Sequence, residues 1–190
     1  MFNTMYYDRF SGSMSSGALR PIDLTGLASS PDSAQERNMK TLLNPKDKEH
    51  LLARLQQIGP DSARQWGKMS AHQMICHLSD GFRMYMALKM VEPIAVPVPR
   101  SLLKWVALKA PIPWPKGFRT APELDQQTGG TSPTEFAKDV GELRELMNSF
   151  VEQPATFPWP AHPHFGPMSH ADWMRLGYLH TDHHLRQFGA

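Results

Sequence analysis

The sequence predicts an all-α fold, a four-helix bundle whose second and third helices are joined by a long proline-rich connection. Apolar residues recur every three or four positions in four segments, and capping residues precede these segments. No segment shows the alternation of apolar and polar residues that a half-buried strand requires. Helices of roughly 15–20 residues without strands are typical of a bundle.

The first two helices are bounded by recognisable capping signals. Asn44 is expected to cap a helix whose first residue is Pro45 and which ends before Gly59-Pro60. Ser70 is expected to cap a longer helix that runs to about Met90. The predicted apolar stripe of this second helix consists of Met74, Leu78, Gly81, Tyr85 and Leu88.

The segment from Val91 to Gly130 differs from the rest of the chain because prolines interrupt it repeatedly. Residues Arg100 to Ala110 are expected to form a short amphipathic helix within it. A connection of this length in a compact domain is usually either functional or disordered. The tryptophans of this connection favour the first alternative, so we expect the segment from Pro93 to Trp114 to pack on the bundle and cover a pocket.

Two further helices follow the connection. Ser132 and Glu135 have the spacing of a capping box, with Pro133 at the first helical position, and they predict a third long helix through Phe150. The fourth helix is expected to be capped at Ser169 and to continue to the C-terminus.

Residues 1–41 are expected to form an extension, and residues 42–190 the bundle. The extension is rich in Ser, Gly, Asp and Asn and has no apolar period, so the sequence predicts disorder there. It lacks the long apolar run of a secretory signal. A transit peptide and a biological start at Met39 both remain open.

The composition argues against several classes of function. The net charge is +2 and Lys and Arg do not cluster, so nucleic-acid binding is not expected. Prolines and charges break the most apolar region, so no membrane span is expected. The single cysteine, Cys76, fits a reducing compartment, from which we expect a cytoplasmic protein. We interpret Cys76 as a packed residue rather than a nucleophile.

The strongest functional signal lies in the last predicted helix, where three of the nine histidines fall within five residues. His180 and His184 are four positions apart, so they lie one turn apart on the side that carries Trp173 and Gly177. Two neutral imidazoles with this spacing can bind one divalent metal ion. The alternative is that both are buried histidines with ordinary hydrogen bonds.

His77, on the predicted apolar stripe of the second helix, is the expected third ligand. Bundles build metal sites from side chains on facing helices. Three histidine ligands leave at least one coordination position open, which is typical of a catalytic site rather than a structural one. A buried neutral histidine needs partners for both ring nitrogens, and a metal on one and a carbonyl or carboxylate on the other would provide them.

Five further residues are candidates for a pocket around these three histidines. His162 and His164 lie in the loop before the fourth helix, where they either line the mouth of a pocket or are exposed. Gln187 lies about one turn beyond His183 and could orient a ligand or substrate. Trp114 lies at the end of the segment that is expected to cover the site.

Three segments of the chain, residues 69–78 (MSAHQMICHL), 162–166 (HPHFG) and 180–189 (HTDHHLRQFG), resemble the DUF1569 proteins of the DinB/YfiT-like superfamily of four-helix bundles. The resemblance covers the chain from about Thr41 to its end. In that superfamily one histidine of the second helix and two at i and i+4 of the fourth bind a divalent metal such as zinc or nickel. The matching positions here are His77, His180 and His184.

The resemblance implies a site without implying an activity, because DUF1569 is a domain of unknown function. The wider superfamily includes thiol-dependent transferases and an isomerase that use bacillithiol or mycothiol. One hypothesis is therefore a metal-dependent enzyme whose partner is a small-molecule substrate or a low-molecular-weight thiol. The other is a non-catalytic, metal-stabilised or metal-free bundle that binds a partner. The sequence places no Asp or Glu on the histidine-bearing stripes, so a general acid or base is not evident and the first hypothesis is weakened. The sequence leaves open whether the protein forms a homodimer.

Overall fold

The computed structural model describes residues 39–117 and 120–190. Within these residues the chain forms five α-helices, one short 3₁₀ helix and no β-strand, so the predicted all-α fold is confirmed. Most of the predicted N-terminal extension, residues 1–38, lies outside the described residues. None of the helices in the described part of the chain has the length and apolar character needed to cross a membrane.

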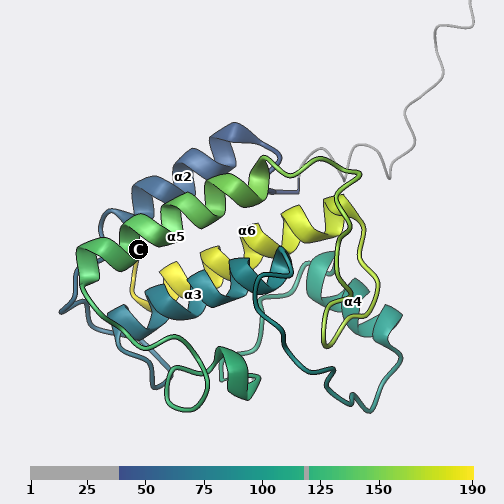
Figure 1. Cartoon of the computed structure of the whole chain (residues 1–190), viewed down its shortest axis with the longest axis horizontal. Coiled ribbons are helices and arrows are strands. Elements are labelled where there is room, and N and C mark those ends of the chain that lie inside the picture. Colours follow the sequence, from purple (N-terminus) through teal and green to yellow (C-terminus); the bar gives the residue numbers. More distant parts are fainter. Residues whose placement is uncertain (1–38, 118–119) are drawn as a thin grey trace, which may run out of the picture. The chain divides into compact units, whose positions relative to one another are not determined.

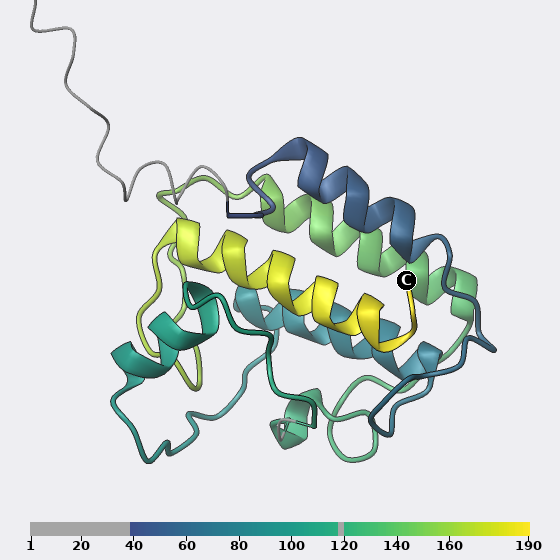
Figure 2. The same cartoon turned by 180° about the vertical axis from the view of Figure 1, so that it is seen from behind.

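Four helices form the bundle: α2 (Pro45–Leu55), α3 (Ala71–Tyr85), α5 (Phe136–Val151) and α6 (His170–Gln187). Helix α3 contacts α5, and α6 contacts both α2 and α3, so the four helices lie side by side (Figure 1). The connection between α3 and α5 contains α4 (Arg100–Leu108) and the 3₁₀ helix η2 (Pro122–Leu124). Helix α4 packs against α6 and η2 against α3, so the connection follows the two helices that carry the histidines (Figure 2).

The core between the helices consists mainly of apolar side chains, and Trp173, Phe82 and Phe150 are among its largest fully buried ones. Gly177 permits the close approach of α6 to this core. A Cβ atom added at Gly177 would lie 2.8 Å from Leu42 Cδ1 and 3.1 Å from Phe150 Cε1. Leu42 is itself buried, so the chain contributes to the core from the residue at which the bundle was predicted to begin.

Three of the predicted helix caps are confirmed. The side chain of Asn44 accepts a hydrogen bond from a backbone N–H in the first turn of α2, with Pro45 at the start of the helix. Ser70 and Ser169 cap α3 and α6, and each forms a complete capping box with the residue three positions further on.

The predicted end of α3 is wrong, because the helix stops at Tyr85 and not near Met90. The Leu88 N–H donates to the carbonyl of Arg83 at 2.8 Å, as in a Schellman motif. Ala87 takes the left-handed conformation, with φ of 59°, that this motif requires. Glycine usually occupies that position, so the sequence carries no signal for the helix end. Leu88, which was predicted to lie on the apolar stripe, is 67% exposed.

The predicted capping box at Ser132 and Glu135 is also wrong. Helix α5 begins at Phe136, and Glu135 caps it without a side-chain hydrogen bond. The carboxylate of Asp139, in the first turn, instead accepts hydrogen bonds from the backbone N–H and the hydroxyl of Thr134, at 2.9 and 2.8 Å. An acidic side chain inside the helix therefore bonds the residue preceding the cap, in place of the predicted serine and glutamate.

Candidate metal centre

Helices α3 and α6 bring His77, His180 and His184 together. The centroids of the three rings are 4.8 to 5.0 Å apart in each pair. One ligand nitrogen from each ring lies within 4.8 Å of the other two, so the group could hold a metal ion. His77 and His184 are 4% and 8% exposed, which places this cluster inside the bundle.

The hydrogen bond of His77 determines which of its ring nitrogens is free. Nδ1 lies 2.8 Å from the carbonyl oxygen of Leu124, in η2. Because a carbonyl oxygen only accepts, Nδ1 carries the proton and Nε2 keeps its lone pair. The connection between α3 and α5 therefore sets the tautomer of a histidine in α3, with Nε2 directed towards α6.

His184 is oriented by a chain of two hydrogen bonds. Its Nδ1 lies 2.8 Å from the amide oxygen of Gln187. The amide nitrogen of Gln187 donates to the carbonyl of Trp66 at 2.8 Å, which fixes the orientation of the amide. His184 therefore also carries its proton on Nδ1 and presents the lone pair of Nε2. Gln187 was predicted to orient a ligand or substrate; in the structure its direct partners are His184 and the Trp66 backbone.

His180 contacts the hydroxyl of Tyr85, which lies 2.8 Å from Nδ1. Its Nε2 lies 3.1 Å from Nε2 of His77. Because Nε2 of His77 carries no proton, Nε2 of His180 must be the donor of this hydrogen bond, and Nδ1 of His180 then accepts from the Tyr85 hydroxyl. The hydroxyl can also accept, so the His180 proton can move to Nδ1 when Nε2 is needed as a ligand. Gly81 makes room for this ring, since a Cβ atom there would lie 3.3 Å from His180 Cε1. With the proton on Nδ1, all three histidines present Nε2 lone pairs to one another.

This donor set fits a divalent cation. Metal-binding histidines characteristically donate their second ring N–H to a protein acceptor, and His77 and His184 do so here. Burial lowers the pKa of all three imidazoles, and for His180 and His184 well below the ordinary value. The rings are therefore neutral at neutral pH, which is the form that binds metal ions.

A buried carboxylate that the sequence reading did not identify, Asp80, holds the connection in place beside the histidines. Its side chain is fully buried and contacts Arg83 at 2.9 Å and Lys89 at 2.8 Å. The backbone N–H and the hydroxyl of Thr131 both donate to it at 2.7 Å. Burial raises the pKa of Asp80, but hydrogen bonds from Lys89 and Thr131 outweigh it and hold the pKa below its usual value. In the sequence, this ion pair could have been recognised from the spacing: an acidic residue stands three positions after His77, and Arg83 stands three positions further on.

The five predicted pocket residues lie in three different places. Gln187 belongs to the support of His184. Trp114 and His183 lie beside the cluster: the Trp114 ring is 6.2 Å from that of His180 and 5.9 Å from that of His183, and the His183 ring is 5.3 Å from that of His184. The other two, His162 and His164, lie in a turn closed by the backbone bridge between His162 and Gly166.

His162 is a buried, neutral histidine rather than an exposed one. Its Nδ1 accepts the backbone N–H groups of His164 and Phe165, at 3.1 and 3.3 Å. Burial, assisted by the charges of His164 and Arg100, lowers the pKa of His162 to about 3. Its proton therefore resides on Nε2 at neutral pH.

The burial of His162 predicts that the folded protein loses stability as the pH falls. Between about pH 6.5 and 3 the unfolded chain binds a proton at this residue and the folded chain does not, so stability decreases as the pH falls. His162→Asn keeps an acceptor for the two N–H groups but does not titrate. From pH 6 to 4 the metal-free variant should lose about 2–3 kcal/mol less unfolding free energy than the metal-free wild type, measured with urea. Equal losses in both proteins would contradict this assignment.

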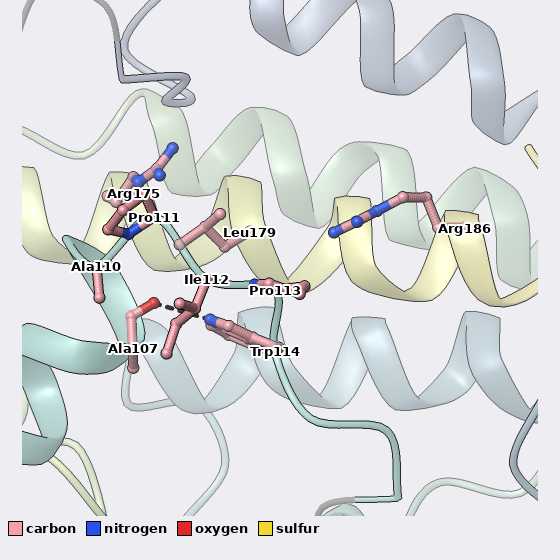
Figure 3. Close-up of a pocket in the computed structure, with 9 residues that line it drawn as sticks. All are labelled: Ala107, Ala110, Pro111, Ile112, Pro113, Trp114, Arg175, Leu179 and Arg186. Carbon is pink, nitrogen blue, oxygen red and sulfur yellow. Dashed lines mark hydrogen bonds between the residues drawn. The ribbon is translucent and has the colours of Figure 1, made fainter.

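A cavity of about 290 Å³ is lined by Trp114 and lies between α6 and the segment that follows α4. Figure 3 shows Arg175, Leu179 and Arg186 along α6 and the indole of Trp114 below them, with its N–H bonded to the Ala107 carbonyl at 2.8 Å. The rest of the lining is apolar and consists of Ala107, Ala110, Pro111, Ile112 and Pro113. Trp114 thus lies beside the histidine cluster and also lines a cavity that has Arg175 and Arg186 on its wall.

The molecule is therefore an α-helical bundle in which three histidines from two facing helices could hold a metal ion. The family model of the DinB superfamily matches residues 33–188, a span that includes all three histidines, and the chain belongs to the DinB superfamily. No curated protein and no solved structure matches the chain.

Proposed function

We propose that this protein is a metal-dependent enzyme in which His77, His180 and His184 hold a divalent ion, zinc or nickel, that activates a small thiol or water. The observation that carries the proposal is the arrangement of hydrogen bonds: each Nδ1 is bonded outward, so the Nε2 atoms face one another. Residues 69–78, 162–166 and 180–189, which resemble DUF1569 proteins, further support membership of that branch of the superfamily. The sole cysteine, buried and unpaired, supports a cytoplasmic location.

The three histidines would leave one coordination position of the ion open. Three neutral imidazoles bring no negative charge to a divalent ion and occupy three positions of a tetrahedral site. When bound, such an ion would supply a Lewis acid that lowers the pKa of a coordinated thiol or water. The chain itself orients the three rings through Leu124, Tyr85 and Gln187 and keeps them in apolar surroundings.

The cavity lined by Trp114 is the proposed position of the substrate. Its apolar walls suit a small organic molecule. Arg175 favours an acidic group on that molecule, because guanidinium groups bind carboxylates and phosphates, whereas Arg186 already pairs with Asp182 at 2.8 Å. Arg175 bonds the carbonyl of Leu108, so its side chain is held in place at the cavity wall.

The alternative, a metal-stabilised bundle without catalytic activity, is favoured by one observation. The Nδ1 partners of the three histidines are a backbone carbonyl, a phenol and an amide, and none of them is a carboxylate. Burial raises the pKa of Tyr85, so this phenol is a poor base at neutral pH. An enzyme of this kind would thus rely on the ion and on the substrate for proton transfer.

The two functions differ in their response to small thiols. The cobalt-loaded Cys76→Ser protein, which has no thiol of its own, should develop a thiolate-to-cobalt charge-transfer band when a low-molecular-weight thiol is added. The same titration with the additional change His77→Ala should give no band. A cobalt spectrum that is unchanged by every thiol and anion tried would show a closed site and support the non-catalytic bundle.

A further inference from the structure

A second group of side chains that could hold a metal ion lies between α3 and α5 and is separate from the three histidines. It consists of His72 and Cys76, four positions apart on α3, and Asp139 on α5. The His72 Nε2 atom lies 2.7 Å, and the Cys76 Sγ atom 3.7 Å, from Oδ2 of Asp139. One ligand atom from each residue lies within 4.8 Å of the other two. Cys76 and Asp139 are buried, at 3% and 8% exposed.

The negative charge of Asp139 is balanced differently from that of Asp80, the other buried carboxylate described above. Asp80 contacts two cationic side chains, Arg83 and Lys89. Among the described residues, the ion pairs that involve Asp139 include neither Lys nor Arg, and its one basic partner is His72. A buried carboxylate requires hydrogen bonds, a counter-charge or a metal ion. Asp139 has the hydrogen bonds of Thr134 and lacks a permanently cationic partner.

We propose that His72, Cys76 and Asp139 form a second metal site, which binds a borderline-soft divalent cation of the zinc type and joins α3 to α5. Imidazole, thiolate and carboxylate are the three ligand types that zinc accepts. On binding, the Cys76 thiol loses its proton to solvent and the sulfur forms the metal bond. Thiolate and carboxylate then balance the two positive charges of the ion, and His72 stays neutral.

Only a small rearrangement is needed to reach this geometry. With metal–ligand bonds of about 2.0 Å to nitrogen and oxygen and 2.3 Å to sulfur, tetrahedral ligands lie roughly 3.3–3.6 Å apart. The ion would thus replace the hydrogen bond between His72 and Asp139 and draw Cys76 inward. Thr134 would continue to support the carboxylate, as metal-ligating carboxylates commonly require. The side chain of His72 is 21% exposed, which leaves a path for the ion and for a water as fourth ligand.

This site does not depend on the function proposed for the three histidines. Cys76 precedes His77 in the sequence, but the sulfur contacts α5 whereas the His77 ring contacts α6. Without a cation, burial and the charge of Asp139 raise the pKa of Cys76 to about 12, so the thiol keeps its proton.

The test uses cobalt(II) added to the metal-free full-length protein without any added thiol. Because Cys76 is the sole cysteine of the chain, a thiolate-to-cobalt band can arise only from this residue. We expect about two cobalt ions per chain, with the band present in the wild type and in His77→Ala. In Cys76→Ser the band should disappear and about one ion should remain. His72→Gln should weaken the band-forming step at least about tenfold in cobalt affinity.

Two results would overturn the proposal, and neither would contradict the three-histidine site. The first is a folded wild-type protein, by circular dichroism, that binds cobalt at the three histidines and shows no thiolate band at saturation. The second is a band whose cobalt dependence is unchanged in both His72→Gln and Asp139→Asn. In either case the three residues form a hydrogen-bond network only. His72→Gln keeps the Thr134 contacts intact, so the test does not depend on whether Asp139→Asn folds.

Discussion

Replacing His180 and His184 together with Ala is expected to remove the ion of the three-histidine site. The single Ala variants at His77, His180 and His184 should each lose most of it, because each removes one of three ligands. At a free zinc concentration of 100 times the Kd, binding contributes about 2.7 kcal/mol to stability. The double variant should lose this contribution, measured as the difference in unfolding free energy with and without zinc.

The control for this experiment is a histidine outside both clusters. His50 is exposed on α2, so His50→Ala should leave the metal content and the zinc-dependent stability unchanged. Working in a Cys76→Ser background restricts the measurement to the three-histidine site. Full zinc occupancy of the His180→Ala, His184→Ala double variant, by elemental analysis, would refute the assignment of these ligands.

Truncating Asp80 to Ala is expected to destabilise the protein by about 3–5 kcal/mol. The change leaves two partly buried cations, Arg83 and Lys89, without their shared carboxylate, and it removes both acceptors of Thr131. Urea unfolding at neutral pH measures the loss. Asp80→Asn should cost less, because an amide oxygen can still accept one of the Thr131 hydrogen bonds.

Asp80→Ala should also weaken metal binding, although Asp80 is not one of the three ligands. The connection anchored at Thr131 carries Leu124, whose carbonyl orients His77. Loosening this support is expected to lower zinc affinity about 10–100-fold, the usual effect of losing an indirect partner of a metal ligand. Asp61→Ala is the matched control, since Asp61 is exposed and its loss should change stability by less than about 0.5 kcal/mol. A zinc affinity unchanged by Asp80→Ala, in protein shown to be folded, would mean that Asp80 does not support the metal site.

The sequence was sufficient to predict the features that depend on residues close together in the chain. The spacing of His180 and His184 and the caps at Ser70 and Ser169 are local patterns, and the structure reproduces them. His77 could be added because its helix carries a strong apolar stripe, on which the ring must face the core. The prediction failed at the end of α3, where Ala87 adopts a left-handed conformation that alanine rarely takes.

The partners that orient the histidines could not be read from the sequence. Leu124 and Trp66 contribute backbone carbonyls, which are present at every residue and leave no mark on the sequence. Tyr85 was placed correctly on the apolar stripe, but that assignment treats the ring as packing and says nothing of its hydroxyl. Asp139 was missed for a similar reason: its partners lie on α3 and in the turn before α5, so only the folded chain brings them together.

X-ray absorption spectroscopy of the zinc-loaded Cys76→Ser protein tests the central claim most directly, since it reports the atoms bound to the ion in the three-histidine site. The structure predicts about three imidazole nitrogens at roughly 2.0 Å, with one further light ligand that is not histidine. Loss of the imidazole signal in the His180→Ala, His184→Ala background should follow. A protein that takes up no zinc, or a zinc shell without imidazole scattering, would contradict the claim that His77, His180 and His184 form a metal centre.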